Sequence, residues 1–200
     1  RPLMSLLSCV EMQSTGRGAT ARIALSGASL PHIHSRILRL PEVPDAVQVE
    51  LDAAQRHWQE ARTCLFCQLA EAELCDGART VIETEQICGW TAYAGRQPYE
   101  MWFAPRRHQA RFECIDENTA RNLADALRRV LAALSRRMPR LSYNLLLHTA
   151  PRHEAWDEAF HWHWELIPRV SRMAGLELGS GMYISTMLPE DAAAKLRALC

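Results

Sequence analysis

The sequence predicts an α+β fold in which helices cover a mostly antiparallel sheet. Short strand-like segments occur at 80–83, 87–92, 99–104, 141–148 and 159–169, and the last of them alternates between apolar and polar residues. A polar helix is expected at 48–62, and apolar residues at helical spacing indicate a long amphipathic helix at 116–138. Strands in this order, with helices laid on the sheet that they form, indicate the α+β class.

The other elements follow from local signals. Two prolines within residues 41–47 end a first strand pattern and indicate a linker before the helix at 48–62. Residues 116–118 can cap the long helix, whose apolar stripe is expected to be core and which Pro139 ends. We also expect a short helix or loop at 71–76, a strand with glycines at 176–184, and a C-terminal helix at 192–199.

Length and charge limit the class of protein. Two hundred residues are enough for one domain, or for one domain and part of another, with a hydrophobic core. Basic and acidic residues are equal at 23 each, so no overall charge attracts nucleic acid or an anionic membrane. No apolar run approaches a membrane span, and residues 1–5 do not resemble a signal peptide. We expect a cytoplasmic protein that acts on small molecules, without nucleic-acid or membrane partners.

One segment, at 160–169, concentrates residues that can carry chemistry. If it is a strand, two-residue alternation places His161, His163 and Glu165 on one face. Trp162 and Trp164 then point to the other face and into the core. Two imidazoles and a carboxylate so arranged suit a metal ligand beside a nucleophile or general base. The alternative, about equally weighted, is a half-buried strand whose histidines happen to face solvent.

Four residues have the identity and order of a zinc site: Cys64, Cys67, His108 and His161. Two thiolates on a tight turn and two imidazoles from neighbouring strands would form a closed tetrahedral Zn²⁺ site that ties the fold together. Seven cysteines, an odd number in a chain without an export signal, favour free thiols and a metal over disulfides. Redox activity is an alternative that would need a thioredoxin-like helix after the cysteines, and we expect none. His163 would then stay free to attack phosphorus.

A second His-x-His motif lies near the N-terminus. His32, His34 and Arg36 fall on one face of a predicted strand. The small residues at 27–29, including Ser29, would let backbone N–H groups approach an anion such as a phosphate. An ordinary turn that leads into a strand explains the same residues about equally well.

The segments considered so far, with several others, run in a fixed order along the chain: 27–35, 64–67, 79–83, 98–100, 105–108, 143–144, 148–151, 161–163 and 175–177. This order resembles that of the galactose-1-phosphate uridylyltransferases, two-repeat members of the histidine-triad superfamily. The resemblance implies a histidine-triad-like antiparallel sheet with flanking helices. It also implies three parts: 1–44 as the remnant of an N-terminally truncated first repeat, 45–62 as a linker helix, and 63–200 as a complete second repeat.

The resemblance further implies a ping-pong nucleotidyl transfer. His34 would attack the α-phosphorus of UDP-glucose and release glucose 1-phosphate, and galactose 1-phosphate would then take the uridylyl group from the histidine. By the same comparison, His32 would bind a metal, Ser29 would contact phosphate, and Glu177 would hold the hexose hydroxyls. Family members are homodimers whose active sites are completed by the second repeat of the partner chain.

Some family members bind their second metal through other ligands. These are a glutamate near Glu50 and histidines at the positions of His148, His161 and His163. Because both ligand sets contain His161, they compete, and the two cysteines favour the zinc set described above.

Two positions depart from the family motif, Ile33 in place of proline and Arg36 in place of glutamine. Glutamine donates neutral hydrogen bonds to a bound phosphoryl group, whereas arginine is longer and permanently charged. Arg36 would therefore bind the phosphoryl group differently from the family's glutamine. Two alternatives therefore accompany the transferase. One is a histidine-triad nucleotide phosphorylase or hydrolase, with His34 or His163 as nucleophile. The other is a non-catalytic, zinc-stabilised nucleotide-binding module.

Overall fold

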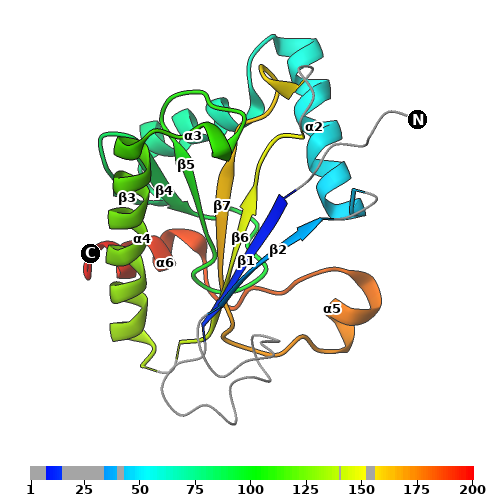
Figure 1. The fold of residues 1–200 in the computed structure, drawn as a ribbon. Coiled ribbons are helices and arrows are strands. Elements are labelled where there is room, and N and C mark those ends of the chain that lie inside the picture. Colours follow the sequence, from blue (N-terminus) through cyan, green and yellow to red (C-terminus); the bar gives the residue numbers. More distant parts are fainter. Residues whose placement is uncertain (1–7, 15–33, 40–42, 140, 152–155) are drawn as a thin grey trace.

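The computed structural model of the protein describes residues 8–14, 34–39, 43–139, 141–151 and 156–200. In this part of the chain, seven strands form an antiparallel sheet in the order β2-β1-β6-β7-β5-β4-β3 (Figure 1). The strands are β1 Ser8–Ser14, β2 His34–Arg39, β3 Thr80–Glu83, β4 Ile87–Thr91, β5 Met101–Pro105, β6 Tyr143–His148 and β7 His163–Pro168. The predicted α+β class and antiparallel sheet are confirmed.

Helices cover both faces of this sheet. α4 and α6 pack on one face, and α3, with α2 beside it, on the other (Figure 1). The helices are α2 Asp45–Ala61, α3 Leu65–Asp76, α4 Glu117–Arg137, α5 Gly175–Ser180 and α6 Pro189–Arg197, with a 3-10 turn at Phe112–Cys114. No helix among the described residues is long and apolar enough to cross a membrane.

β7 lies inside the sheet and is buried along its whole length. Trp162 and Trp164 meet the ring of Phe112 edge to face, at centroid distances of 5.1 and 5.6 Å, in the core under α4 and α6. His163 and Glu165 alternate with them and face α2 and α3, with exposures of 0% and 5%. The predicted alternation is present, and because both faces are covered, these two side chains are not solvent-facing.

α4 forms as the sequence predicts. The Asp116 side chain accepts a hydrogen bond from the backbone N–H of Thr119 at 2.7 Å, which caps the first turn. One stripe of the helix, including Leu123, Val130 and Leu134, is buried in the main core. The predicted core role of this stripe is confirmed.

α3 begins earlier than expected. It starts at Leu65, directly after Cys64, and not near residue 71. The short helix expected at 71–76 is therefore the end of a longer one, and the expectation that no thioredoxin-like helix accompanies the cysteines is wrong, as is the expected tight turn. Phe66 and Ala70 on this helix are buried against the sheet, and packing of such an apolar face supplies most of the stability of a short helix.

The strand expected at 176–184 is also wrong, because Gly175–Ser180 is the helix α5. The Glu177 carboxylate accepts a hydrogen bond from the backbone N–H of Ala174 at 2.9 Å and closes the first turn. Gly181 ends the helix at φ 70°, a left-handed conformation that glycine adopts without a steric cost.

Several other boundaries differ from the predictions by a few residues, and three of them concern the segments that position the site. The linker helix α2 starts at Asp45 and not at residue 48. β5 starts at Met101, because Tyr99 takes a φ of 64° that a strand cannot contain. β7 starts at His163, so His161 lies in the loop just before the strand.

The N-terminal strands belong to the same sheet as the rest of the chain. β1 pairs with β6 over residues 10–14, and β2 pairs with β1. Segments on both sides of the linker helix α2 therefore share one sheet. The division into 1–44, 45–62 and 63–200 stays a prediction.

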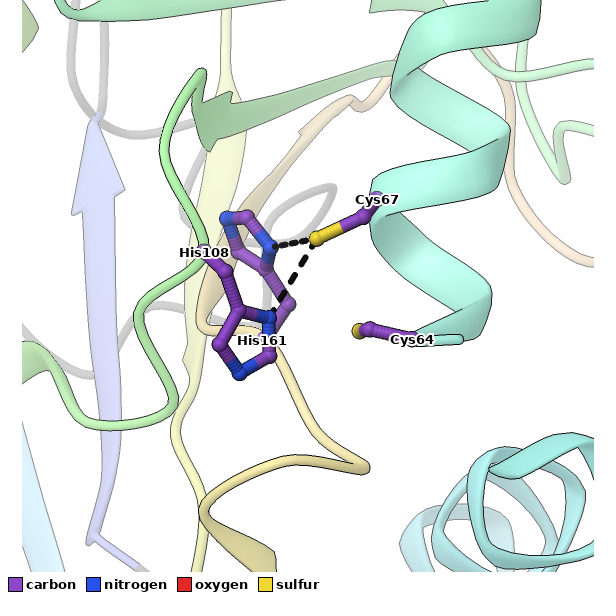
Figure 2. A group of neighbouring side chains, drawn as sticks. All are labelled: Cys64, Cys67, His108 and His161. Atoms are coloured by element: carbon purple, nitrogen blue, oxygen red, sulfur yellow. Dashed lines mark hydrogen bonds between the residues drawn. The ribbon is translucent and has the colours of Figure 1, made fainter. Parts of the chain in front are cut away.

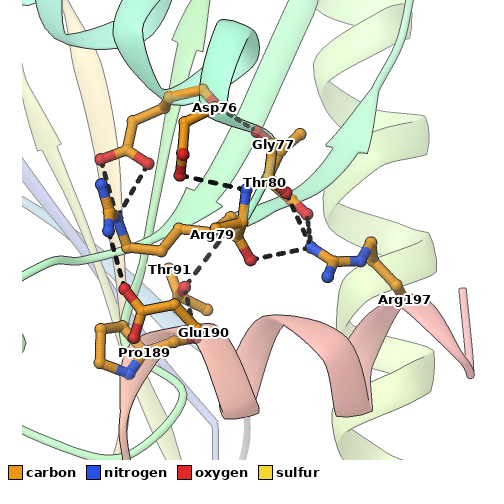
Figure 3. Close-up of polar contacts among 10 residues, drawn as sticks. Asp76, Gly77, Arg79, Thr80, Thr91, Pro189, Glu190 and Arg197 are labelled. Atoms are coloured by element: carbon orange, nitrogen blue, oxygen red, sulfur yellow. Dashed lines mark hydrogen bonds and ion pairs between the residues drawn. The ribbon is translucent and has the colours of Figure 1, made fainter.

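A polar network fastens α6 to the loop between α3 and β3 (Figure 3). Arg79 Nε lies 3.0 Å from the carboxylate of Glu73, and Arg79 Nη1 lies 2.7 Å from that of Glu190 at the start of α6. At the other end of α6, Arg197 donates to the backbone carbonyls of Gly77, Ala78 and Thr80. The C-terminal helix is held at both ends.

Replacing Arg79 with methionine should lower the free energy of unfolding by about 2–3 kcal/mol, because the Glu73 side chain, only 8% exposed, would lose its cation. Urea denaturation would measure the loss. Arg121→Met is the matched control, since Arg121 pairs with Glu117 on the surface, where both side chains are more than 70% exposed. There a change below about 0.5 kcal/mol is expected. Equal losses in the two variants would contradict the assignment.

Candidate functional site

Two cysteines and two histidines meet at the start of α3. Cys64 is the residue that precedes the helix, and Cys67 lies in its first turn. His108 comes from the loop after β5 and His161 from the loop before β7. The Cys67 Sγ lies 3.3 Å from Nδ1 of His108 and 3.2 Å from Nδ1 of His161 (Figure 2). All four candidate ligand atoms lie within 4.8 Å of one another. The histidines come from loops, not from the strands that were predicted.

The chemistry of this set fits a zinc ion. Zn–S bonds of about 2.3 Å and Zn–N bonds of about 2.0–2.1 Å in a tetrahedron give an S-to-N edge of about 3.6 Å. The two observed S-to-N distances lie close to that edge. The backbone carbonyl of Asp157 lies 2.7 Å from Nε2 of His108, and accepting its proton would leave Nδ1 free to face the sulfur.

The thiols and imidazoles of this set influence one another. A hydrogen bond from the Cys67 thiol lowers the pKa of the Cys64 thiol far below its usual value, although burial opposes this. The same pairing raises the pKa of Cys67. A hydrogen bond with Cys64 also raises the pKa of His108. Of the two thiols, that of Cys64 is therefore the more readily ionised.

A second cluster lies on the other side of His163 and consists of Glu50, His148 and His163. The Glu50 carboxylate lies 2.7 Å from Nδ1 of His148 and 3.5 Å from Nε2 of His163. Burial would raise the pKa of Glu50, but His163 and the hydrogen bond from His148 lower it below its usual value. Burial lowers the pKa of His163. A carboxylate and two imidazoles could ligate a metal ion and leave further coordination positions open.

His161 faces the cysteines and takes no part in the second cluster. The two ligand sets that were expected to compete for it are therefore separate in space. Glu50, His148 and His163 form their cluster without a fourth protein ligand among the described residues.

His163 is enclosed by aromatic rings. Its ring stacks on Trp102 at a centroid distance of 4.9 Å and on Phe66 at 4.7 Å. Its Nδ1 lies 3.1 Å from the backbone carbonyl of His161. The sequence analysis assigned His163 a role in binding the substrate or attacking phosphorus. In this structure its side chain is fully buried.

Glu165, the third polar residue of the alternating segment, has a separate partner. Its carboxylate pairs with Arg96, and Nε2 of His148 lies 4.0 Å away. Arg96 also reaches Glu100 at 2.8 Å. Sequence reasoning did not single out Arg96, Phe66 or Trp102. For Phe66 the sequence offered one signal, its position between Cys64 and Cys67, which placed it near the candidate zinc site. For Arg96 and Trp102 it offered none.

Only the last part of the N-terminal motif, from His34 on, belongs to the described residues. His34 begins β2, where it is paired with Gln13, and Gln13 is paired with Asn144 of β6. Three strand spacings separate β2 from β7, roughly 14 Å. Arg36 is paired with Glu11 in the same register. Ser29 and His32 lie outside the described residues, and Glu177 lies on the exposed helix α5. Among the described residues, only the second of the two His-x-His motifs contributes histidines to the clusters of candidate metal ligands.

Comparison with known proteins gives relatives over most of the chain. No protein-family model matches it. An ADP-glucose phosphorylase from Arabidopsis thaliana is 28% identical over 176 residues, 87% of this chain and 49% of the relative. A galactose-1-phosphate uridylyltransferase from Thermotoga maritima is 30% identical over 179 residues, 86% of this chain and 56% of the relative. A solved structure of ADP-glucose phosphorylase from Arabidopsis thaliana with bound ADP-glucose matches 98% of this chain and 59% of its own, with 27% identity and a TM-score of 0.81.

The chain spans about half the length of the curated relatives that it matches. The matched part nevertheless includes nearly the whole fold described above. The resemblance that the sequence motifs indicated is confirmed, and the chain is homologous to the galactose-1-phosphate uridylyltransferase-like proteins.

Proposed function

We propose that the protein transfers a nucleotidyl group from a nucleotide sugar to a phosphate-bearing acceptor, through a covalent nucleotidyl-histidine at His34. The observation that carries the proposal is the homology, over 86–87% of the chain, with a uridylyltransferase and a phosphorylase. A phosphorylase uses inorganic phosphate as its acceptor, and a galactose-1-phosphate uridylyltransferase uses a sugar phosphate, so both activities transfer a group to a phosphate oxygen. The placement of His34 at the start of a strand is consistent with this role.

The preferred reaction uses UDP-glucose and galactose 1-phosphate. An imidazole nitrogen of His34 bonds to the α-phosphorus as the bond from that phosphorus to the bridging oxygen breaks, and glucose 1-phosphate leaves. A phosphate oxygen of galactose 1-phosphate then attacks the same phosphorus, forms UDP-galactose and frees the histidine. In this proposal Ser29 and Arg36 hold the phosphoryl oxygens, and Glu177 holds the hexose hydroxyls.

A second candidate is phosphorolysis of ADP-glucose with inorganic phosphate as acceptor. Two observations favour it. The phosphorylase relative is 28% identical to the chain, close to the 30% of the uridylyltransferase. In addition, the guanidinium of Arg36 is permanently charged and suits a small anionic acceptor better than a neutral amide does.

Incubating the chain with UDP-glucose or ADP-glucose labelled in the α-phosphate should leave acid-labile label on the protein. His34→Ala should abolish the label, and His57→Ala, on the linker helix, should retain it. Chasing the labelled protein with galactose 1-phosphate or inorganic phosphate then separates the two reactions. Label that survives His34→Ala would overturn the assignment of the nucleophile.

We also propose that Cys64, Cys67, His108 and His161 hold a structural Zn²⁺ ion. The donor types and the S-to-N distances described above support the assignment. A zinc with four protein ligands has no open position and joins α3 to the loops that lead out of β5 and into β7. His32, the other predicted metal ligand, would belong to a separate site with the first motif.

Cys64→Ser should reduce the zinc content of the purified chain by about one ion per molecule, because a neutral hydroxyl is a far weaker ligand than a thiolate. Elemental analysis would measure the content. Cys75→Ser, an exposed thiol on the same helix, is the matched control and should leave it unchanged. If both variants kept the zinc of the original chain, the ligand set would be excluded.

The proposed function includes a homodimer. The segment around α5 extends away from the sheet (Figure 1) and exposes Leu178, Met182, Ile184 and Leu188 by 61–70%. A row of large apolar side chains this exposed favours a protein partner. Glu177 lies in the same segment, so a second copy placed there would bring this carboxylate towards the active site of its partner.

The double variant Leu178→Asp, Ile184→Asp should shift a dimer to monomer, because two charges would be buried at the contact. Sedimentation velocity would detect the change. Val49→Asp, 66% exposed on α2, is the control and should leave the assembly intact. A double variant that sediments like the original chain would place the interface elsewhere.

A further inference from the structure

A cavity of about 300 Å³ lies on the sheet face under α3, and two of its wall residues, Trp102 and Glu165, separate it from the cluster of Glu50, His148 and His163. Its wall is formed by the β4–β5 hairpin, by one side of α3 and by the part of β7 that carries Glu165. None of the candidate metal ligands lines it. Its size is at the lower end of the range for small-molecule sites.

Aromatic side chains form much of the wall. Trp90 of β4 and Trp102 of β5 are paired directly across the hairpin, with ring centroids 6.4 Å apart. Tyr93 stands at the rim with 76% of its surface exposed. The guanidinium of Arg79 lies over the Tyr93 ring at 5.2 Å. One of these rings therefore already contacts a cation.

The charges of the wall are unbalanced. Three buried carboxylates, those of Glu73, Glu100 and Glu165, line the cavity. Arg96, which also lines the cavity, pairs with Glu100 and Glu165, and Arg79, from outside the wall, pairs with Glu73, so three carboxylates share two cations. Arg79 is shared further with Glu190. His148 lies 4.0 Å from Glu165 on the side away from the cavity. It is paired with Glu50, so it does not neutralise the remaining negative charge of the cavity wall.

These properties select one ligand chemistry. A phosphate or carboxylate would add negative charge to a site that already has an excess of it. Ionised carboxylates only accept hydrogen bonds, so the ligand must supply donors. Indole and phenol rings favour a cation over their faces. We propose that this cavity binds a small organic cation, an alkylammonium or alkylguanidinium group, between the aromatic wall and the carboxylates.

The proposal goes beyond the nucleotidyl transfer proposed above and does not depend on it. Nucleotide sugars and sugar phosphates are anions, so this cavity is not a second place for them. The cation could be a free amine or a lysine or arginine side chain of another protein. The chemistry is the same in both cases, and the tests below separate them.

Titration of the chain with n-butylammonium, followed by tryptophan fluorescence and calorimetry, should show saturable binding. n-Butanol has nearly the same size and no charge, and it should bind at least tenfold more weakly. Methylguanidinium should compete with n-butylammonium, and acetate should not. Equal binding of the amine and the alcohol would overturn the proposal, because the site would then be merely apolar.

Two variants test the location. Leu69 lies on α3 at the cavity and is 39% exposed. Leu69→Lys would place an ammonium group of the protein itself in the cavity, and it should abolish the binding of n-butylammonium. Tyr93→Ser should weaken binding roughly threefold to fivefold through loss of a cation–π contact. Tyr183→Ser, in a neighbouring cavity that does not contain Leu69, is the control and should bind as the original chain does. Circular dichroism would establish that each variant is folded.

Unchanged binding in both Leu69→Lys and Tyr93→Ser would overturn the location. A tripeptide with a central lysine and blocked ends separates the two sources. If it binds at least tenfold more tightly than n-butylammonium, the natural ligand is a basic side chain of a protein. If it binds equally or more weakly, the ligand is a free amine.

Discussion

The alternation of side chains from His161 to Leu166 is the constraint on which the rest of the structure depends. Trp162 and Trp164 fill the core under α4 and α6, and this fixes which way the residues between them face. His161, His163 and Glu165 must then lie towards α2 and α3. Each meets a different partner there: the cysteines, the Glu50 cluster and Arg96. A shift of one residue in register would put Trp162, Trp164 and Leu166 in their places.

Local sequence signals were sufficient where a single capping residue, a regular spacing of apolar residues or a short motif determined the local structure. Asp116 and the apolar stripe after it identified α4, and the Cys-x-x-Cys spacing identified two of the four clustered ligands. The signals failed where packing decided. The helix after Cys64 is stabilised by the burial of Phe66 and Ala70 against strands that lie later in the chain. Nothing in residues 65–76 alone reveals those strands.

The separation of the two histidine clusters also lay beyond the sequence. The strand pattern placed His161 and His163 on one face, and it could not decide between one shared metal and two separate roles. His161 instead lies in the loop before β7, while His163 is fixed in the strand between two aromatic rings. Glu50 reaches the second cluster from a helix about a hundred residues earlier. Such long-range contacts depend on how α2 packs, which no local pattern encodes.

The pairing of β1 with β6 has a consequence for any shorter form of the chain. β6 now has a neighbour on each side, so its backbone donors and acceptors are used within the sheet. Without the first 44 residues, β6 would become an edge strand carrying Leu145, Leu146 and Leu147 beside a row of open hydrogen-bonding groups. An edge of this kind is a template for pairing with another molecule. By pairing with β6, the N-terminal strands thus prevent that strand from pairing with another molecule.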